Sequence, residues 1–213
     1  MNGVLRTLFF ALVVRPLVYL GLGLNVRHVE RLPKKGPAIL VANHNSHLDT
    51  LVLISLFPLR ELKRIRPVAA MDYFLKNRAL AWFALKIIGI LPLDRQVRAS
   101  KGDPLAGCSE ALERGDILIL FPEGSRGDPE SMSEFKTGIA HLAKRHPDVP
   151  VTPLFLHGLG KALPKGDWVP VPFFCDVFVG EAVPWEGNRK AFMTELEASV
   201  TGLAEEGTFG EWL

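Results

Sequence analysis

The clearest candidate for chemistry is a histidine with a carboxylate five positions later, His44 and Asp49, in Asn43-His44-Asn45-Ser46-His47-Leu48-Asp49. The segment follows an apolar run at 38–42 that is typical of a buried strand. Ser46 and Asp49 have the spacing of a helix-capping pair, so a helix should begin near Ser46 and leave His44 in the preceding turn, within reach of the carboxylate. A carboxylate in that place sets the tautomer of an imidazole and stabilises its protonated form, as a general base requires. The spacing also permits a plainer interpretation, in which Asp49 only caps the helix.

A second cluster, Phe121-Pro122-Glu123-Gly124-Ser125-Arg126-Gly127, follows the apolar run 117–120. A glycine-containing turn at a strand end exposes backbone N–H groups to an anion, and Arg126 adds a planar cation suited to phosphate. Glu123 is costly to bury unless it is paired. The alternative is a tight turn in which Glu123 and Arg126 are simply solvated.

A third segment, Gly89-Ile90-Leu91-Pro92-Leu93-Asp94-Arg95, is again an apolar run that ends in a charged pair. Arg95 is suited to hold a phosphate, but it is equally suited to pair with Asp94. A fourth, Val149-Pro150-Val151-Thr152-Pro153, has no titratable side chain, so its default role is structural.

Apolar runs alternate with helical patterns along the chain of 213 residues, which predicts a single α/β domain. We expect a sandwich with a central, largely parallel or mixed sheet flanked by helices, and a site at the carboxyl ends of its strands. The expected strands cover 38–42, 66–70, 90–93, 116–121, 151–156 and 173–179. The expected helices cover 47–57, 78–88, 104–114, 133–145 and 188–204.

We expect residues 1–25 to form a membrane-associating segment and residues 26–213 to form the catalytic domain. The apolar runs 8–14 and 17–24 are interrupted by Arg15-Pro16, and no small-residue cleavage site follows. An arginine in mid-span costs roughly 2.5–3.5 kcal/mol on insertion scales, and Pro16 disfavours helical geometry at Arg15. We therefore expect a broken helix that lies on the membrane and does not span it. An ordinary buried helix is the alternative.

Charge is distributed unevenly along the chain. Residues 1–106 carry 16 Lys and Arg against 6 Asp and Glu, whereas residues 107–213 carry 9 against 17. A basic half indicates a surface that faces something anionic, and the stretch Arg27, Arg31, Lys34 and Lys35 follows the apolar segment. Nucleic acid is not the expected partner, because no aromatic platform is interleaved with these cations. The two cysteines, Cys108 and Cys175, cannot build a disulfide framework.

Taken in order, the four segments resemble those of the glycerolipid acyltransferase family, typified by bacterial 1-acylglycerol-3-phosphate acyltransferase. His44 and Asp49, with Asn43 before them, match the His-x4-Asp block of that family, and residues 89–95 match its second block. Residues 121–126 match Phe-Pro-Glu-Gly followed by Ser/Thr-Arg, and residues 149–153 match Val-Pro-Val-x-Pro. Residues 135–138 also match a Phe-Lys-x-Gly stretch that is typical after the third block.

The resemblance implies a glycerol-3-phosphate acyltransferase-like fold and a 1-acylglycerol-3-phosphate O-acyltransferase-like enzyme. Such an enzyme moves a fatty acyl group from acyl-CoA or acyl-carrier protein to the free hydroxyl of lysophosphatidic acid in phospholipid synthesis. It further implies that His44 is the general base and that Asp49 orients it. The resemblance assigns acceptor binding to Arg95, Glu123, Gly124, Ser125 and Arg126, with the two arginines on the phosphate.

The same resemblance implies work at the cytoplasmic face of the cell membrane, with a membrane lipid as acceptor and no metal or other cofactor. Backbone N–H groups of the His44 loop or near Gly124 are the expected donors to the oxyanion of the thioester. Another lysolipid acceptor is the alternative within this class. From other classes, a metal-dependent hydrolase drawing on His44, His47 and Asp49, or a non-catalytic lipid-binding protein, remains open. A nucleophilic Ser125 is less favoured, because Glu123 stands where a nucleophile elbow has its first glycine.

Overall fold

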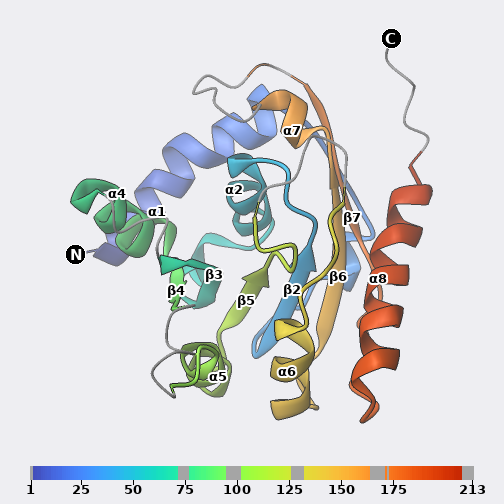
Figure 1. The fold of residues 1–213 in the computed structure, drawn as a ribbon. Helices are drawn as coiled ribbons and strands as arrows, with labels where there is room; N and C mark the ends of the chain where they lie inside the picture. Colours follow the sequence, from blue (N-terminus) through green and yellow to red (C-terminus); the bar gives the residue numbers. More distant parts are fainter. Residues whose placement is uncertain are drawn as a thin grey trace.

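The structure is a computed structural model that describes residues 2–71, 77–94, 102–125, 132–163, 171 and 173–207. Its centre is a sheet of seven strands in the order β1-β7-β6-β2-β5-β3-β4 (Figure 1). Every neighbouring pair is parallel except β6 and β7, which are antiparallel. The predicted α/β fold with a largely parallel sheet is therefore confirmed. The strands are β1 (Gly23–Arg27), β2 (Ala38–Ala42), β3 (Ile65–Ala70), β4 (Leu91–Leu93), β5 (Ile117–Leu120), β6 (Val151–His157) and β7 (Phe174–Val179).

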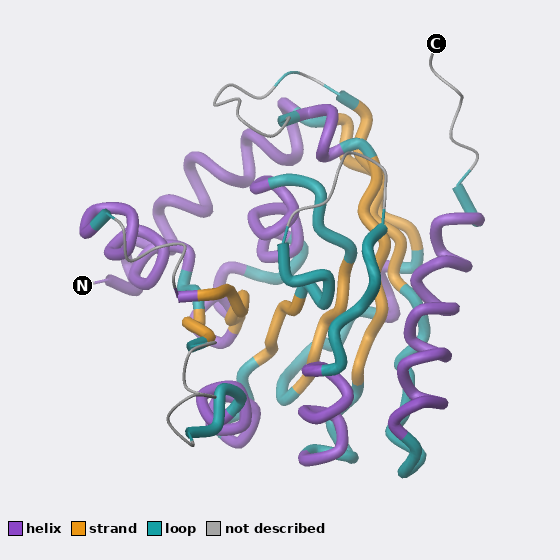
Figure 2. Tube along the Cα trace, in the orientation of Figure 1, coloured by secondary structure: helices purple, strands orange, loops and turns teal. Residues whose placement is uncertain are grey.

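Helices cover both faces of the sheet, and each face has its own core (Figures 1 and 2). Strand β2 is buried throughout, because its side chains alternate between the two cores: Leu40 packs on one face, and Ile39 and Val41 on the other. The first face carries the N-terminal helix, α2 (His47–Ser55) and α7 (Leu159–Ala162). The opposite face carries α5 (Ala106–Glu113), α6 (Gly138–Arg145) and α8 (Arg189–Glu205).

The N-terminal helix is continuous from Gly3 to Gly21, so the expected break at Arg15-Pro16 is wrong. Arg15 (φ −63°, ψ −45°) and Pro16 (φ −58°, ψ −43°) both have right-handed helical geometry. After α1 (Asn2–Phe9), two π-helical turns, η1 (Phe10–Val14) and η2 (Leu17–Gly21), lie on either side of the proline. Their wider hydrogen bonds, including Leu22 N–H to Leu17 O at 3.0 Å, accommodate a residue that cannot donate.

One stripe of this helix is docked on the domain. Phe10, Val14, Val18 and Leu22, spaced four residues apart, are buried in the core, and Arg6 continues the stripe. The Arg6 guanidinium donates to Ile65 O at 3.0 Å and to Ile88 O at 2.9 Å, and Arg15 donates to Phe57 O at 2.7 Å. The opposite side of the helix is exposed. The helix is thus neither wholly buried nor detached.

The chain enters the sheet sooner than expected. The edge strand β1 begins at Gly23 and pairs with β7, so the expected boundary between residues 25 and 26 falls inside a strand. The short helix η3 (Val29–Arg31) follows, and Lys34 and Lys35 then precede the amino end of β2. These two lysines therefore lie at the opposite end of β2 from His44.

The remaining helices pack beside the N-terminal helix. The helix α4 (Arg78–Phe83) runs into the π-helical turn η5 (Ala84–Ile88), which packs on α1; the Phe9 and Phe83 rings meet edge to face with centroids 5.3 Å apart. The 3-10 helix η4 (Leu59–Arg64) also contacts α1.

Candidate active site

His44 and Asp49 form the dyad that their spacing predicts. The predicted capping box is present, with Ser46 at the N-cap of α2 and Asp49 in its first turn. Because α2 begins at His47, His44 stays in the preceding turn, and its Nδ1 lies 2.9 Å from Asp49 Oδ2. Asp49 is fully buried, whereas the His44 side chain is 18% exposed. The pair therefore joins a buried carboxylate to an imidazole that reaches the surface.

Three N–H donors converge on one oxygen of Asp49. Besides the imidazole, Asp49 Oδ2 accepts the backbone N–H groups of Asn45 at 2.7 Å and Ser46 at 2.8 Å. A carboxylate only accepts hydrogen bonds, so the imidazole must carry its proton on Nδ1. That tautomer makes Nε2 the nitrogen that takes a proton from a substrate.

The imidazole is also held by an aromatic ring. His44 stacks on Phe121, with ring centroids 4.1 Å apart and planes inclined by 20°. The contact follows from the register of β2 and β5, in which Val41 pairs with Leu120 and brings the residues after both strands together. No role for the Phe121 ring was predicted from the sequence. An aromatic residue directly after the neighbouring parallel strand was the available signal.

Glu123 ties the two loops together. Its Oε1 accepts the backbone N–H of His44 at 2.8 Å, and its Oε2 accepts the backbone N–H of Ser133 at 3.1 Å. Burial raises the pKa of Glu123, while these two hydrogen bonds and the electrostatic interaction with His44 act in the opposite direction. The side chain is 4% exposed, and its main-chain partners account for its burial.

Asn43 secures the loop from the other side. Its amide donates to Leu156 O at 2.8 Å and accepts from Leu156 N–H at 2.7 Å, which continues the pairing of β2 with β6 beyond the end of the strand. Ser46 Oγ donates to Leu163 O at 3.1 Å. The turn that carries His44 is thus held by β6, by the segment after α7 and by Glu123.

The expected oxyanion donors are already engaged. The N–H groups of His44, Asn45 and Ser46 donate to Glu123 and Asp49, and the N–H of Gly124 donates to Phe121 O at 3.0 Å. The expectation that the His44 loop or Gly124 itself offers a backbone N–H to the thioester oxygen is therefore wrong for these four groups.

The predicted acceptor-binding residues are only partly described. Gly124 has a φ of +76°, and Ser125 is exposed beside it at the end of β5. Arg95 and Arg126 lie outside the described residues, so the prediction that they hold a phosphate stays a prediction. Asp94 directly follows β4, at the carboxyl end of that parallel strand.

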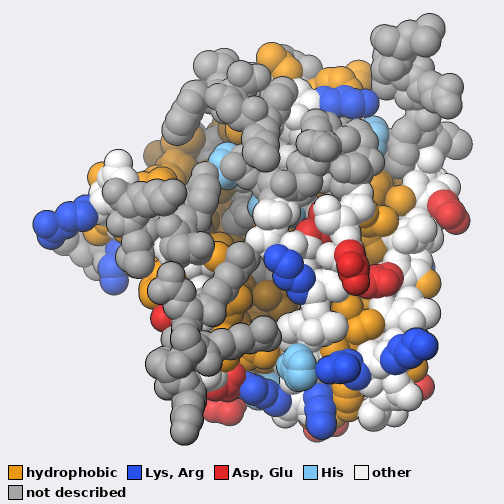
Figure 3. Space-filling view, in the orientation of Figure 1, with side chains coloured by type: hydrophobic (Ala, Val, Ile, Leu, Met, Phe, Trp, Pro, Cys, Tyr) orange, Lys and Arg blue, Asp and Glu red, His pale blue; other side chains and the backbone are white. Residues whose placement is uncertain are grey.

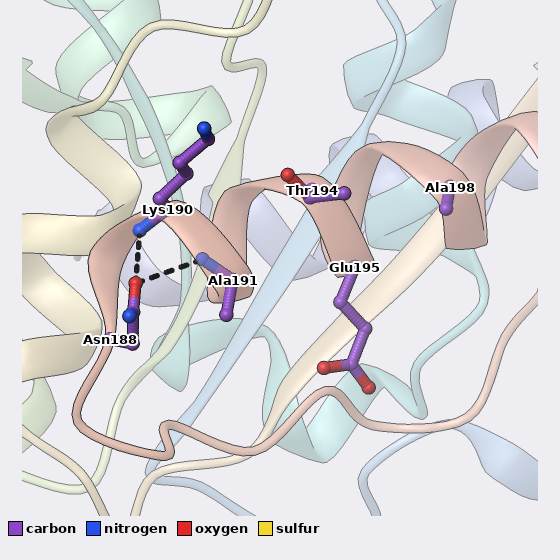
Figure 4. A pocket seen from close by; sticks show the side chains of 6 residues that line it. All are labelled: Asn188, Lys190, Ala191, Thr194, Glu195 and Ala198. Atoms are coloured by element: carbon purple, nitrogen blue, oxygen red, sulfur yellow. Dashed lines mark hydrogen bonds between the residues drawn. The ribbon is translucent and has the colours of Figure 1, made fainter.

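Two shallow hollows formed by described residues lie on the face opposite α2. One runs along α8, where Asn188 caps the helix by accepting from Lys190 and Ala191 N–H, and Lys190 and Glu195 project to different sides (Figure 4). The other, between α6 and the start of α8, is lined by His141, Lys144, Trp185 and Arg189, among others, where basic side chains gather (Figure 3). Neither includes His44 or Glu123. No cluster of three or more His, Cys, Asp or Glu that could hold a metal ion occurs within the described part of the chain.

Comparisons with known proteins agree with this site. A family model described as acyltransferase matches residues 23–157, from β1 to the end of β6. A chloroplast 1-acyl-sn-glycerol-3-phosphate acyltransferase of Arabidopsis thaliana is 33% identical over 144 residues, which are 67% of this chain and 38% of that protein. A 1-acyl-sn-glycerol-3-phosphate acyltransferase of Pseudomonas aeruginosa is 29% identical over 197 residues, 89% of this chain and 70% of that one.

The fold is also that of a solved structure. The crystal structure of the 1-acyl-sn-glycerophosphate acyltransferase from Thermotoga maritima matches with a TM-score of 0.72 and 24% identity, covering 97% of this chain and 81% of that one.

The present chain spans only about two fifths of the length of its chloroplast relatives. The match to the family model covers more than half of the chain and contains the dyad, the glycine turn and the strands that carry them. The chain therefore belongs to the acyltransferase family.

Proposed function

We propose that the chain transfers a fatty acyl group from an acyl thioester to the free hydroxyl of lysophosphatidic acid. The observation that carries the proposal is the 2.9 Å contact between His44 Nδ1 and buried Asp49 Oδ2, which prepares an imidazole to accept a proton on Nε2. The names of the relatives support the acceptor, since the chloroplast and bacterial proteins are both 1-acyl-sn-glycerol-3-phosphate acyltransferases.

The reaction needs one general base and no acyl-enzyme. His44 Nε2 takes the proton of the acceptor hydroxyl as its oxygen attacks the thioester carbonyl, and the carbonyl oxygen becomes an oxyanion. When this intermediate collapses, the carbon–sulfur bond breaks, and the departing thiolate receives the proton from the imidazolium. General-base assistance of this kind contributes about 10²–10⁴ in rate. Asp49 stabilises the imidazolium, and the stacked Phe121 ring holds the imidazole plane.

Within this proposal, the acceptor lies between the His44 loop and the turn at Gly124, with Arg95 and Arg126 on its phosphate. Glu123 acts chiefly by holding the His44 and Ser133 N–H groups. We expect turnover without a metal ion. An excess of chelator should leave the rate unchanged, whereas activity lost in chelator and restored by zinc would favour the metal-dependent hydrolase.

We further propose that the enzyme rests on the cytoplasmic face of the cell membrane. Leu12 and Leu20, on the outer side of the N-terminal helix, are 70% and 86% exposed. The helices α4 and η5, which pack beside α1, expose Leu80, Trp82 and Leu85. An exposed apolar surface of this extent is typical of a protein that docks on a membrane.

The apolar surface extends to the end of the sheet that carries the site. Gly23, just after the helix, pairs with Phe174, and β7 begins beside the carboxyl end of β6. Phe174 is 79% exposed there, at the same end of the sheet as His44. A membrane that contacts Leu20 and Phe174 would therefore lie next to the catalytic histidine.

Cations border the same surface. Arg60, Lys63 and Arg64 are exposed on η4, which contacts α1, and Arg78 and Lys86 are exposed on α4 and η5. Basic residues around an apolar surface add attraction to anionic lipids of about 1 kcal/mol each near the surface. The cations on η4 precede the amino end of β3 and thus lie at the same end of the sheet as Lys34 and Lys35, whereas Arg78 and Lys86 lie on helices that pack on α1.

A crossed assay tests the function. Purified protein in vesicles is given acyl-CoA or acyl-carrier protein as donor, with lysophosphatidic acid, a lysophospholipid with a larger headgroup, or monoacylglycerol as acceptor. We expect turnover with lysophosphatidic acid and at least one donor. Transfer only to another lysolipid would change the proposed acceptor, and lipid binding without any transfer would contradict the proposal.

Vesicle flotation tests the membrane surface. Leu12→Asp and Leu20→Asp should weaken binding to vesicles that contain anionic lipid, and neutral vesicles should bind the wild type less. Val29→Asp is the matched control, because Val29 is 53% exposed on η3, outside this surface. Equal losses for all three variants would contradict the docking proposal.

A further inference from the structure

Lys136 lies against the glycine turn of the candidate site. Its backbone N–H donates to Pro122 O at 2.9 Å, which places the residue beside the turn although its side chain is exposed. A methyl group built on Gly124 would lie 2.4 Å from Lys136 Nζ and 3.1 Å from its Cδ and Cε. The lysine side chain therefore lies flat on Gly124, and a larger residue at that position would push the ammonium away.

The charge of Lys136 has no counter-charge among the described residues. The nearest carboxylate in the turn, Glu123, directs both oxygens to the N–H groups of His44 and Ser133. The structure gives Lys136 no ion pair there, unlike Arg145, which pairs with Asp103, or Arg31, which pairs with Glu181. A cation that pairs with no carboxylate of the described residues is suited to an anion that arrives with a ligand.

This cation is close to the catalytic base. Gly124 follows Glu123, and Glu123 Oε1 holds the His44 backbone N–H at 2.8 Å. The residue that holds the His44 loop and the glycine under the ammonium are thus consecutive in the chain. An acceptor whose hydroxyl approaches His44 would carry a phosphate, two carbon atoms or so away, into reach of this turn.

We propose that Lys136 binds the phosphate of the acceptor, as a specificity-determining residue beyond the arginines that the sequence suggests. The inference rests on the proposed function, because it takes the acceptor to be a phosphomonoester. The ammonium is a compact point charge that meets one or two phosphate oxygens, and Gly124 supplies the space in which it does so. A merely structural lysine would act through its methylene stem on Gly124, and its charge would be dispensable.

Three variants separate these roles. Lys136→Met keeps an unbranched apolar stem over Gly124 and removes the charge, while Lys136→Arg keeps the charge. Lys144→Met is the matched control, because Lys144 is an exposed lysine in the last turn of α6, away from the glycine turn. Each variant is assayed for its KM for lysophosphatidic acid, its KM for the acyl donor and its thermal midpoint.

Lys136→Met should raise the KM for lysophosphatidic acid about tenfold, the effect of losing one charge-assisted contact near the surface. The KM for the donor and the thermal midpoint should stay at their wild-type values, Lys136→Arg should retain most of the affinity, and Lys144→Met should match the wild type. An unchanged KM for lysophosphatidic acid in Lys136→Met would overturn the proposal. So would an equal rise in both KM values together with a lower thermal midpoint.

Binding without turnover keeps this inference distinct from the proposed function. In a His44→Ala background, which disables the base, lysophosphatidic acid in detergent micelles should bind about tenfold more weakly when Lys136→Met is added, and equally well when Lys144→Met is added. If the wild type transfers no acyl group, the proposed function fails, and this binding ratio alone decides the role of Lys136. A ratio near one would overturn the inference whatever the turnover.

Discussion

Glu123 accepts the backbone N–H of His44 at 2.8 Å, although the two residues are 79 positions apart in the chain. This contact makes the turn after β2 and the turn after β5 one unit. It gives a physical reason for the histidine block and the Phe-Pro-Glu-Gly block to occur together, since the backbone of His44, the proposed base, is held by Glu123. The same carboxylate reaches Ser133, so a third segment is attached to the unit.

The buried carboxylate of Glu123 predicts a pH dependence of stability. Burial raises its pKa above the ordinary value of about 4.3. The folded chain then keeps a proton that the unfolded chain has lost, so this group lowers the free energy of unfolding as pH rises from about 4.3 through the raised pKa. Glu123→Gln removes this contribution.

Urea unfolding of the wild type and of Glu123→Gln at a series of pH values measures the effect. The wild-type value minus the variant value should fall as pH rises across this window. A difference that rises with pH would mean that the hydrogen bonds to His44 and Ser133 outweigh burial, and would reverse the direction stated for the pKa.

Asp49→Asn should reduce kcat far more than it changes KM. The amide can place its NH₂ group toward the imidazole and thereby favour the wrong tautomer, and a neutral group no longer stabilises the imidazolium. We expect a loss of about a hundredfold or more in kcat. Steady-state kinetics measure this loss, and circular dichroism checks the folding. Asp148→Asn, at an exposed acid after α6 and outside the site, is the control. A folded Asp49→Asn variant with wild-type kcat would remove Asp49 from the mechanism.

Arg6→Met should loosen the N-terminal helix. The buried guanidinium supplies donors to Ile65 O and Ile88 O, and its removal leaves those carbonyls without them. Burial, and the charge of Arg66, lower the pKa of Arg6 to about 10, so part of the cost is offset by relief of a buried charge. We expect a loss of about 1–3 kcal/mol in the free energy of unfolding, measured by urea denaturation.

The control is Arg60→Met, at an exposed position on η4, which should change the free energy of unfolding by less than about 0.5 kcal/mol. Equal effects of the two variants would refute the docking role of Arg6.

The cysteines should be dispensable for catalysis. Cys108 is buried, and burial, with a smaller effect of Asp103, raises the pKa of its thiol to about 11. Almost no thiolate is therefore present near pH 8, and an acyl thioester on Cys108 is not expected. Iodoacetamide should leave the native enzyme active, and Cys108→Ala should retain kcat with only a modest loss of stability. Inactivation by the reagent, prevented by acyl donor, would indicate a covalent route.

Local patterns in the sequence predicted much of this molecule. The Ser46–Asp49 spacing predicted the start of α2, and with it the meeting of His44 and Asp49, because a capping box depends on residues within one turn. The buried strands were equally readable from continuous apolar runs. Strand β1 was missed because Gly23–Arg27 is an edge strand in which half-buried and exposed residues alternate, and its apolar residues were attributed to the preceding segment.

What the sequence did not predict depends on contacts between distant segments. The bond from Glu123 to the His44 N–H and the stack of Phe121 on His44 arise only when β2 and β5 pair side by side. The continuity of the N-terminal helix was also missed. The local rule for a residue before proline disfavours helix at Arg15, but two π-helical turns and a bond from Arg15 to Phe57 O outweigh it.

The most direct test of the account is the turnover of His44→Ala. The rate of acyl transfer from a thioester donor to lysophosphatidic acid is measured for this variant and for the wild type, with folding checked by circular dichroism. The account predicts that the variant folds, still binds lysophosphatidic acid, and loses about 10²–10⁴ in rate or more. A folded variant that retained near wild-type turnover would show that the imidazole is not the base.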